Sequence, residues 1–160
     1  MTNKLEKGVS LIVAFLVMTI MLAIVLNVGL ILFSEIKISG NIGNAVSSLY
    51  AAESGIEKTL YFDKKQIPVG ATRGVCSICD TCNSSDCQNC VATPLATGGC
   101  DSLSCTNCNV QYNSDFGDRS YTVDAKITPY SPSPSISIFN IDSKGLYKGI
   151  LRVVEINTNQ

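Results

Sequence analysis

Eight cysteines carry most of the chemistry that this sequence offers, and all of them lie in one stretch. The spacing C-x2-C-x2-C-x4-C-x2-C-x9-C-x4-C-x2-C covers Cys76, Cys79, Cys82, Cys87, Cys90, Cys100, Cys105 and Cys108. Thiols at this density form disulfides in oxidising compartments, and elsewhere they bind metals or run redox reactions. The stretch holds few large apolar residues, so we expect cross-links or a metal to maintain its shape.

Disulfide bonding of all eight cysteines is the interpretation that the sequence favours. The number is even, and the stretch is expected to lie outside the cytoplasm, where thiols oxidise. Eight cysteines allow roughly a hundred pairings, so no individual bridge is predicted. The alternative is a zinc site formed by Cys87, Cys90, Cys105 and Cys108. Its two C-x2-C pairs are separated by positions 91–104, slightly fewer than the usual ~15–20 residues. A redox dithiol at the first C-x2-C pair is a third interpretation.

The rest of the composition excludes several functions. The chain has 160 residues, a net charge of −1 and no histidine. Near-balanced charge gives no electrostatic basis for binding nucleic acid, and histidine acid–base chemistry is ruled out. Asn83-Ser-Ser matches a glycosylation triplet, but such triplets are common by chance. We find no nucleophile–base arrangement, no glycine-rich phosphate loop and no paired-carboxylate motif. We therefore predict a protein that is not an enzyme and needs no cofactor.

A long uncharged run, Val9 to Phe33, predicts how the cysteine stretch is positioned. As a helix it would be roughly 37 Å long, enough to cross a hydrocarbon core of about 30 Å with some tilt. Lys4 and Lys7 precede it, so the positive-inside rule places leader 1–8 in the cytoplasm and the chain after Phe33 outside. The run is longer than a signal-peptide core and lacks a small-residue cleavage site. We expect a single-pass anchor in the cytoplasmic membrane.

The helical period continues through residues 34–62 but becomes one-sided. The predicted apolar stripe consists of Ile38, Ile42, Ala45, Leu49, Ala52, Ile56 and Leu60. Such spacing is typical of a helix with one face packed on a core. Gly40 and Gly43 each cost about 1 kcal/mol relative to alanine in a helix, so we expect a bend or break there. Pro68 and the glycines after it end the helical region.

The residues from the leader to the end of this segment resemble a known family. The stretch GNIGNAVSSLYAAESGIEK resembles the "GN…A…AAE.G.E" signature of PilX-type minor pilins. The matching residues are Gly40, Asn41, Ala51, Ala52, Glu53, Gly55 and Glu57. A short basic leader ending in glycine, followed by a long apolar helix, is similar to type IV pilins and pseudopilins in general. The resemblance covers roughly residues 4–62 and does not include the cysteine stretch.

The resemblance implies a processing pathway and a set of partners. A prepilin peptidase would cleave after Gly8, and Val9 would become the methylated amino terminus. The subunit would then pass from the cytoplasmic membrane into an extracellular filament. Its partners would be membrane lipid before assembly, the peptidase, and other pilin subunits contacted through the apolar helix.

One position departs from the family pattern. Most pilins carry glutamate as the fifth residue of the mature chain, where this sequence has Val13. In the family, that glutamate is thought to neutralise the terminal amine of a neighbouring subunit, and an unpaired buried charge is costly. Several PilX-type minor pilins and the K-type tip pseudopilin of type II secretion also lack it. The departure argues against a major pilin and favours a minor, priming or tip-located subunit. We expect this subunit to take part in pilus assembly and adhesion. The tip pseudopilin and a membrane-anchored metal-binding or redox module remain as alternatives.

A small sheet is predicted for residues 119–160. Tyr121 to Ile127 alternate with polar residues, as in a half-buried strand. A loop with Pro129, Pro132 and Pro134 follows, then a strand from Ile136 and Ile138, a turn at Lys144-Gly145 and a third strand over 147–156. Three strands need a cover, and the stripe of 34–62 supplies one. The predicted fold is α+β: a long helix packed against a small antiparallel sheet, with the disulfide-held insertion at 63–118.

Overall fold

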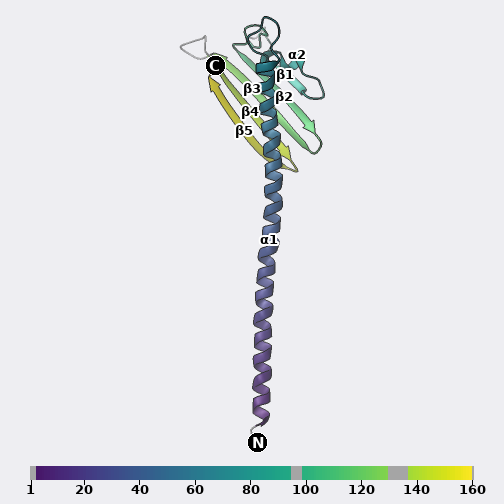
Figure 1. The fold of residues 1–160 in the computed structure, drawn as a ribbon, viewed down its shortest axis with the longest axis vertical. Coiled ribbons are helices and arrows are strands. Elements are labelled where there is room, and N and C mark those ends of the chain that lie inside the picture. Colours follow the sequence, from purple (N-terminus) through teal and green to yellow (C-terminus); the bar gives the residue numbers. More distant parts are fainter. Residues whose placement is uncertain (1–2, 95–98, 130–136, 160) are drawn as a thin grey trace. The chain divides into compact units, whose positions relative to one another are not determined.

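The computed structural model of the chain describes residues 3–94, 99–129 and 137–159. In chain order its elements are α1 (Asn3–Lys65), η1 (Val75–Ser77), α2 (Ile78–Thr81), β1 (Gln88–Ala92), β2 (Cys108–Phe116), β3 (Arg119–Pro129), β4 (Ser137–Tyr147) and β5 (Ile150–Asn159) (Figure 1). The chain divides into two compact units, Met1–Ile42 and Gly43–Gln160, and each is described by itself. The fold is α+β, as the sequence predicts.

The first unit is the apolar part of α1. Its large aliphatic side chains are exposed on all sides, and no charged residue interrupts them from Val9 to Phe33. Within the described residues, α1 contains the one segment long and apolar enough to cross a membrane. This is compatible with a single-pass membrane anchor. The predicted break is wrong, because every residue from Asn3 to Lys65 is helical. Gly40 and Gly43 have open space beside them and no proline follows within the helix, so their propensity cost alone does not interrupt it.

The second unit is built on a five-stranded antiparallel sheet in the order β1-β2-β3-β4-β5. Three strands were predicted, so the sequence analysis missed β1 and β2, which lie in the segment assigned to the insertion. In β2 the buried residues alternate from Cys108 through Val110 and Tyr112 to Ser114, the pattern of a half-covered strand. β2 and β3 form a hairpin that pairs without a break from Cys108 opposite Ile127 to Phe116 opposite Arg119.

The predicted turn at Lys144-Gly145 is also wrong, because both residues lie inside β4. The chain reverses instead at Lys148 and Gly149, which both have positive φ. Gly145 has a different purpose: a Cβ there would collide with the Ser48 carbonyl oxygen and the Ala52 amide of α1. Glycine is needed at this point because the strand backbone touches the helix backbone. The expected positions Pro132, Pro134 and Ile136 lie outside the described residues.

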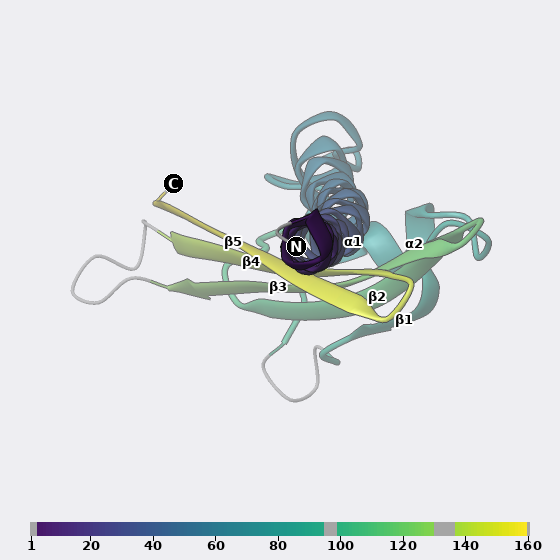
Figure 2. The same cartoon turned by 90° about the horizontal axis from the view of Figure 1, so that it is seen from below.

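From Gly43 onward, α1 covers one face of the sheet (Figure 2). Its buried line consists of Ser48, Ala51, Ala52, Gly55, Ile56, Thr59 and Asp63. The predicted stripe was therefore only partly right: Ala52 and Ile56 are buried, whereas Ile38, Ile42 and Leu49 are exposed. The sheet approaches so closely that small side chains are preferred to large apolar ones. A Cβ on Gly55 would press against Ser143, Val123 and Tyr121.

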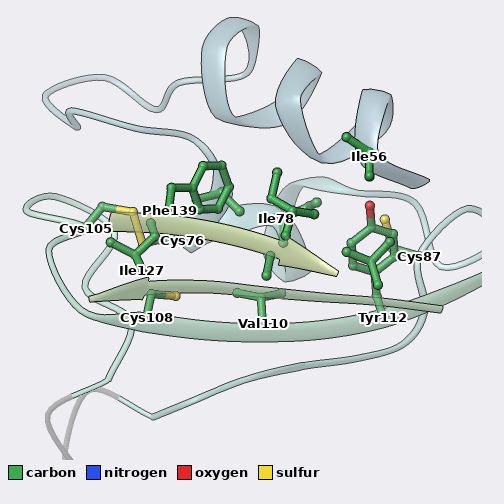
Figure 3. Packing of buried hydrophobic residues seen from close by; sticks show 14 of the residues in the cluster. Ile56, Cys76, Ile78, Cys87, Cys105, Cys108, Val110, Tyr112, Ile127 and Phe139 are labelled. Carbon is green, nitrogen blue, oxygen red and sulfur yellow. A yellow bond between two sulfur atoms is a disulfide. The ribbon is translucent and has the colours of Figure 1, made fainter. Parts of the chain in front are cut away.

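The hydrophobic core lies between α1, the sheet and the cysteine segment (Figure 3). Val110, Val123, Ile127, Phe139 and Ile141 supply the sheet side and are almost completely buried. Ile56 contributes from α1. Val75 and Ile78, in η1 and α2, close the end of the core and are equally buried. The cysteine segment is thus part of the core and not only a surface insertion.

Candidate functional site: the disulfide-bonded segment and the head surface

All eight cysteines are paired in four disulfides. The pairs are Cys76–Cys105, Cys79–Cys90, Cys82–Cys87 and Cys100–Cys108. Cys79–Cys90 joins α2 to β1, while Cys76–Cys105 and Cys100–Cys108 tie η1 and β2 to the loop between β1 and β2. The segment in between has few apolar side chains, so these cross-links supply the stability that burial alone does not.

The disulfides differ in their burial. Cys76 and Cys105 are both buried, and their bond lies beside Phe139 and Ile127 in the core (Figure 3). Cys79, Cys82, Cys90 and Cys100 are only partly buried. The Cys82–Cys87 bond closes a short loop, residues 83–86, whose four residues are exposed. The amides of Asp86 and Cys87 both donate to the Asn83 carbonyl oxygen, which gives this loop a defined turn.

The disulfide pairing leaves no free thiol for the zinc or the redox interpretation of the cysteines. Each cysteine of the alternative zinc set, Cys87, Cys90, Cys105 and Cys108, is bonded to a cysteine outside that set. Cys76 and Cys79, the suggested dithiol, are bonded to Cys105 and Cys90 and not to each other. Among the residues that the structure describes, no group of histidine, cysteine or acidic side chains is arranged to hold a metal ion.

A buried ion pair fixes the chain where it leaves α1 and enters the cysteine segment. Arg73 Nε and Nη2 donate to the two carboxylate oxygens of Asp63, at 2.8 and 2.7 Å. The Asp63 side chain is completely buried and the Arg73 side chain is 11% exposed. The same guanidinium lies 4.3 Å from the ring centroid of Phe139, in β4. Helix, connecting loop and sheet therefore meet at this one arginine.

A second polar contact holds α1 to β2. The hydroxyls of Thr59 and Tyr112 are 2.8 Å apart, and the Tyr112 hydroxyl also donates to the Gly55 carbonyl oxygen at 3.3 Å. Burial raises the pKa of Tyr112, since the phenolate would lose its hydration. Burial likewise raises the pKa of Tyr121, whose ring meets that of Tyr112 edge-on. Both tyrosines are neutral structural groups at ordinary pH.

The face of the sheet that α1 does not cover is mostly polar, with exposed Leu146, Leu151 and Val153 at its β4–β5 end. Gln111, Asp124, Asp142 and Glu155 lie directly opposite one another on β2, β3, β4 and β5. Gln111 Nε2 donates to Asp124 Oδ2 at 2.7 Å. A shallow hollow of about 210 Å³ lies here, lined by Gln111, Thr122, Val123, Asp124, Asp142 and Lys144. A second hollow of about 270 Å³ is lined by Val91, Ala92, Thr93, Pro94, Asn109 and Gln111.

The predicted processing residues lie in the first unit. Gly8 and Val9 are helical residues of α1. Two polar side chains of the apolar run satisfy themselves within the helix: Thr19 donates to the Leu16 carbonyl oxygen, and Asn27 to that of Ala23. They therefore add little polarity to the apolar part of α1, which we call the rod.

Sequence reasoning missed the Asp63–Arg73 pair and the Thr59–Tyr112 contact. It also missed the carboxylate row, which is formed by Asp124, Asp142 and Glu155 on adjacent strands. The carboxylate row had a detectable signal, because Asp124 and Asp142 stand at outward positions of alternating strands. The other two join residues from separate elements and had none.

Comparison with protein-family models, with curated proteins and with solved structures finds no match to this chain.

Proposed function

We propose that this protein is a minor pilin-like subunit of a type IV pilus or related filament, with a part in pilus assembly and adhesion. The observation that carries the proposal is the division of α1. Its first part has exposed apolar side chains all round and follows a basic leader that ends in Gly8. Its part after Gly43 packs a line of small residues onto the sheet.

The exposed apolar rod supports assembly with other helices. Leu11, Phe15, Met18 and the aliphatic residues that follow are about half exposed or more, so they need lipid or neighbouring apolar helices around them. A filament of similar subunits provides such neighbours after the subunit leaves the membrane. Val13 adds no carboxylate for a neighbour's amine, which suits an occasional subunit better than a repeating one.

The disulfide-bonded segment supports a role in contact with surfaces or partners. Cross-linked loops keep one shape outside the cell, and loops positioned by a rigid scaffold often carry recognition. The loop 83–86, closed by Cys82–Cys87, has four exposed residues and is one candidate contact surface in this segment.

Amino-terminal mass analysis of the protein from its own filament-producing cells tests the assignment. The expected mature chain begins with N-methylated Val9 and appears in sheared filaments. Gly8→Ala should abolish cleavage and remove the protein from the filament fraction. Gly29→Ala is the matched control, because this glycine lies in the same rod with nothing near it. A wild-type protein that keeps its initiator methionine in the membrane fraction would contradict the proposal.

A further inference from the structure

The two edges of the sheet are built in opposite ways. β1 forms one edge: it is five residues long, its pairing with β2 shifts register between Gln88 and Val91, and Cys90 ties it to Cys79. Short length and irregular pairing are devices that prevent another strand from adding to an edge. The β1 edge is therefore protected.

β5 forms the other edge and is neither short nor irregularly paired; its charged side chains are Arg152 and Glu155. It is ten residues long, pairs with β4 without a break from Ile150 to Asn159, and contains no proline and no lysine. In the part of the chain that the structure describes, its backbone makes hydrogen bonds with β4 alone. Its outer N–H and C=O groups thus form a template for a further strand (Figure 1, yellow).

The side chains of β5 are also incompletely covered on both faces. Leu151 and Val153, on the face away from α1, are 54% and 53% exposed. Val154 and Ile156, on the α1 face, pack against the core but remain partly exposed. A strand added beside β5 would cover all four of them. Edge addition combines such apolar contacts with main-chain hydrogen bonds.

The charge on this edge indicates which segment would fit. Asp124 lies opposite Asp142, and Asp142 lies opposite Glu155, so three carboxylates stand in adjacent positions on the open face. Like charges directly opposite each other destabilise a sheet. Lys144 stands on the same face beside Asp142, but within the described residues no basic side chain forms an ion pair with any of the three carboxylates. The row ends at Glu155 on the free edge. A cation in the next position would relieve the repulsion.

A second copy of β5 does not supply that cation. Residues opposite each other in an antiparallel pair lie on the same face of the sheet. The β5 residues that share a face with Glu155 are Leu151, Val153, Asn157 and Asn159, whereas Arg152 lies on the other face, opposite Gly145. Self-pairing would thus place no cation opposite Glu155.

We propose that the outer edge of β5 is a docking edge for an extended segment of a different polypeptide, which adds an antiparallel strand and places a lysine or arginine opposite Glu155. The incoming strand carries apolar residues opposite Leu151 and Val153. This assignment does not depend on the filament role.

The test uses the full chain in nonionic detergent micelles and a fluorescein-labelled peptide, Thr-Thr-Val-Lys-Val-Val-Thr-Val, whose lysine faces Glu155 in the antiparallel register. A matched peptide carries glutamate in place of lysine. Fluorescence anisotropy should show the lysine peptide binding about fivefold more tightly, and Glu155→Lys should reverse that order. Glu57→Lys, at an exposed acid of α1, should leave the order unchanged. Amide hydrogen exchange should slow at β5 and not at β1.

Three outcomes would overturn the proposal. The first is binding that ignores the Glu155→Lys exchange. The second is amide protection outside β5. The third is concentration-dependent dimerisation of the chain alone with slowed exchange at β5, which would identify a second copy as the occupant. Failure of cleavage after Gly8 would contradict the filament role and leave the docking edge intact.

Discussion

The Asp63–Arg73 pair gives the sharpest prediction about stability. Its two hydrogen bonds of 2.8 and 2.7 Å form a bidentate contact, and the carboxylate is completely buried. Removing one partner of a buried pair leaves an uncompensated charge, which typically costs about 3–5 kcal/mol. A small domain has only about 5–15 kcal/mol of stability, so either single substitution should unfold the second unit, Gly43–Gln160, under mild conditions.

The perturbations are Asp63→Asn and Arg73→Met. Asp63→Asn keeps the contact of Arg73 with Phe139, at 4.3 Å, and removes only the opposite charge. Arg73→Met removes both, so its cost should be larger by about 0.5–2 kcal/mol. Urea unfolding of the full chain in nonionic detergent, followed by circular dichroism, measures these free energies.

Lys64→Met is the matched control. Lys64 Nζ lies 4.0 Å from Asp63 Oδ2, but its side chain is 54% exposed. An exposed pair at this distance contributes less than about 1 kcal/mol. The double variant Asp63→Leu with Arg73→Met should recover at least half of the loss, because it buries no charge. A loss below about 1 kcal/mol for both single variants would refute the reasoning.

Two further predictions concern the contacts of α1 with the sheet. Gly145→Ala should lower the free energy of unfolding by about 1–3 kcal/mol, because its Cβ would meet the Ser48 carbonyl oxygen. Gly43→Ala, with nothing near it, should be neutral or stabilising by up to about 1 kcal/mol in the same urea titration, and equal effects of the two would contradict the close approach. The raised pKa of Tyr112 means that the folded state holds this proton more tightly than the unfolded state, so its contribution is complete below the unfolded pKa of about 10 and is lost as pH rises above it. The free energy of unfolding should therefore fall by up to about 1.4 kcal/mol per pH unit for this group above pH ~10. Tyr112→Phe should make this fall shallower, whereas Tyr61→Phe, at an exposed tyrosine, should leave it unchanged. An unchanged slope in Tyr112→Phe would count against the assignment.

The sequence predicted those elements whose signal is local. An uncharged run identifies the apolar helix, and the alternation from Tyr121 to Ile127 identifies β3, because each pattern lies within a single element. β2 has the same alternation, but its first inward residue is Cys108, and the density of cysteines around it obscured the strand. Gly145 and Gly149 both resemble turn residues, and only the position of α1 distinguishes a close approach from a turn.

The features that could not be predicted join distant residues. The buried line of α1 runs through Ser48, Gly55 and Thr59 because the sheet backbone comes close. Helical periodicity identifies a buried face by its large apolar residues, so it does not detect such a line. The disulfide pairing and the Asp63–Arg73 contact depend on how separate elements meet in space. For eight cysteines the spacing alone does not select among roughly a hundred pairings.

The placement of the four disulfides has a mechanical consequence. They cross-link positions 76–108 only, so no covalent bond other than the main chain joins α1 to β3, β4 or β5. Apart from the main chain, only non-covalent contacts would hold α1 on these strands under tension applied through the apolar helix. They include the close approach of Gly145 to Ser48 and the Arg73 guanidinium between Asp63 and Phe139. Under strong traction the helix should therefore shear away from the sheet, while the cross-linked segment keeps its own shape.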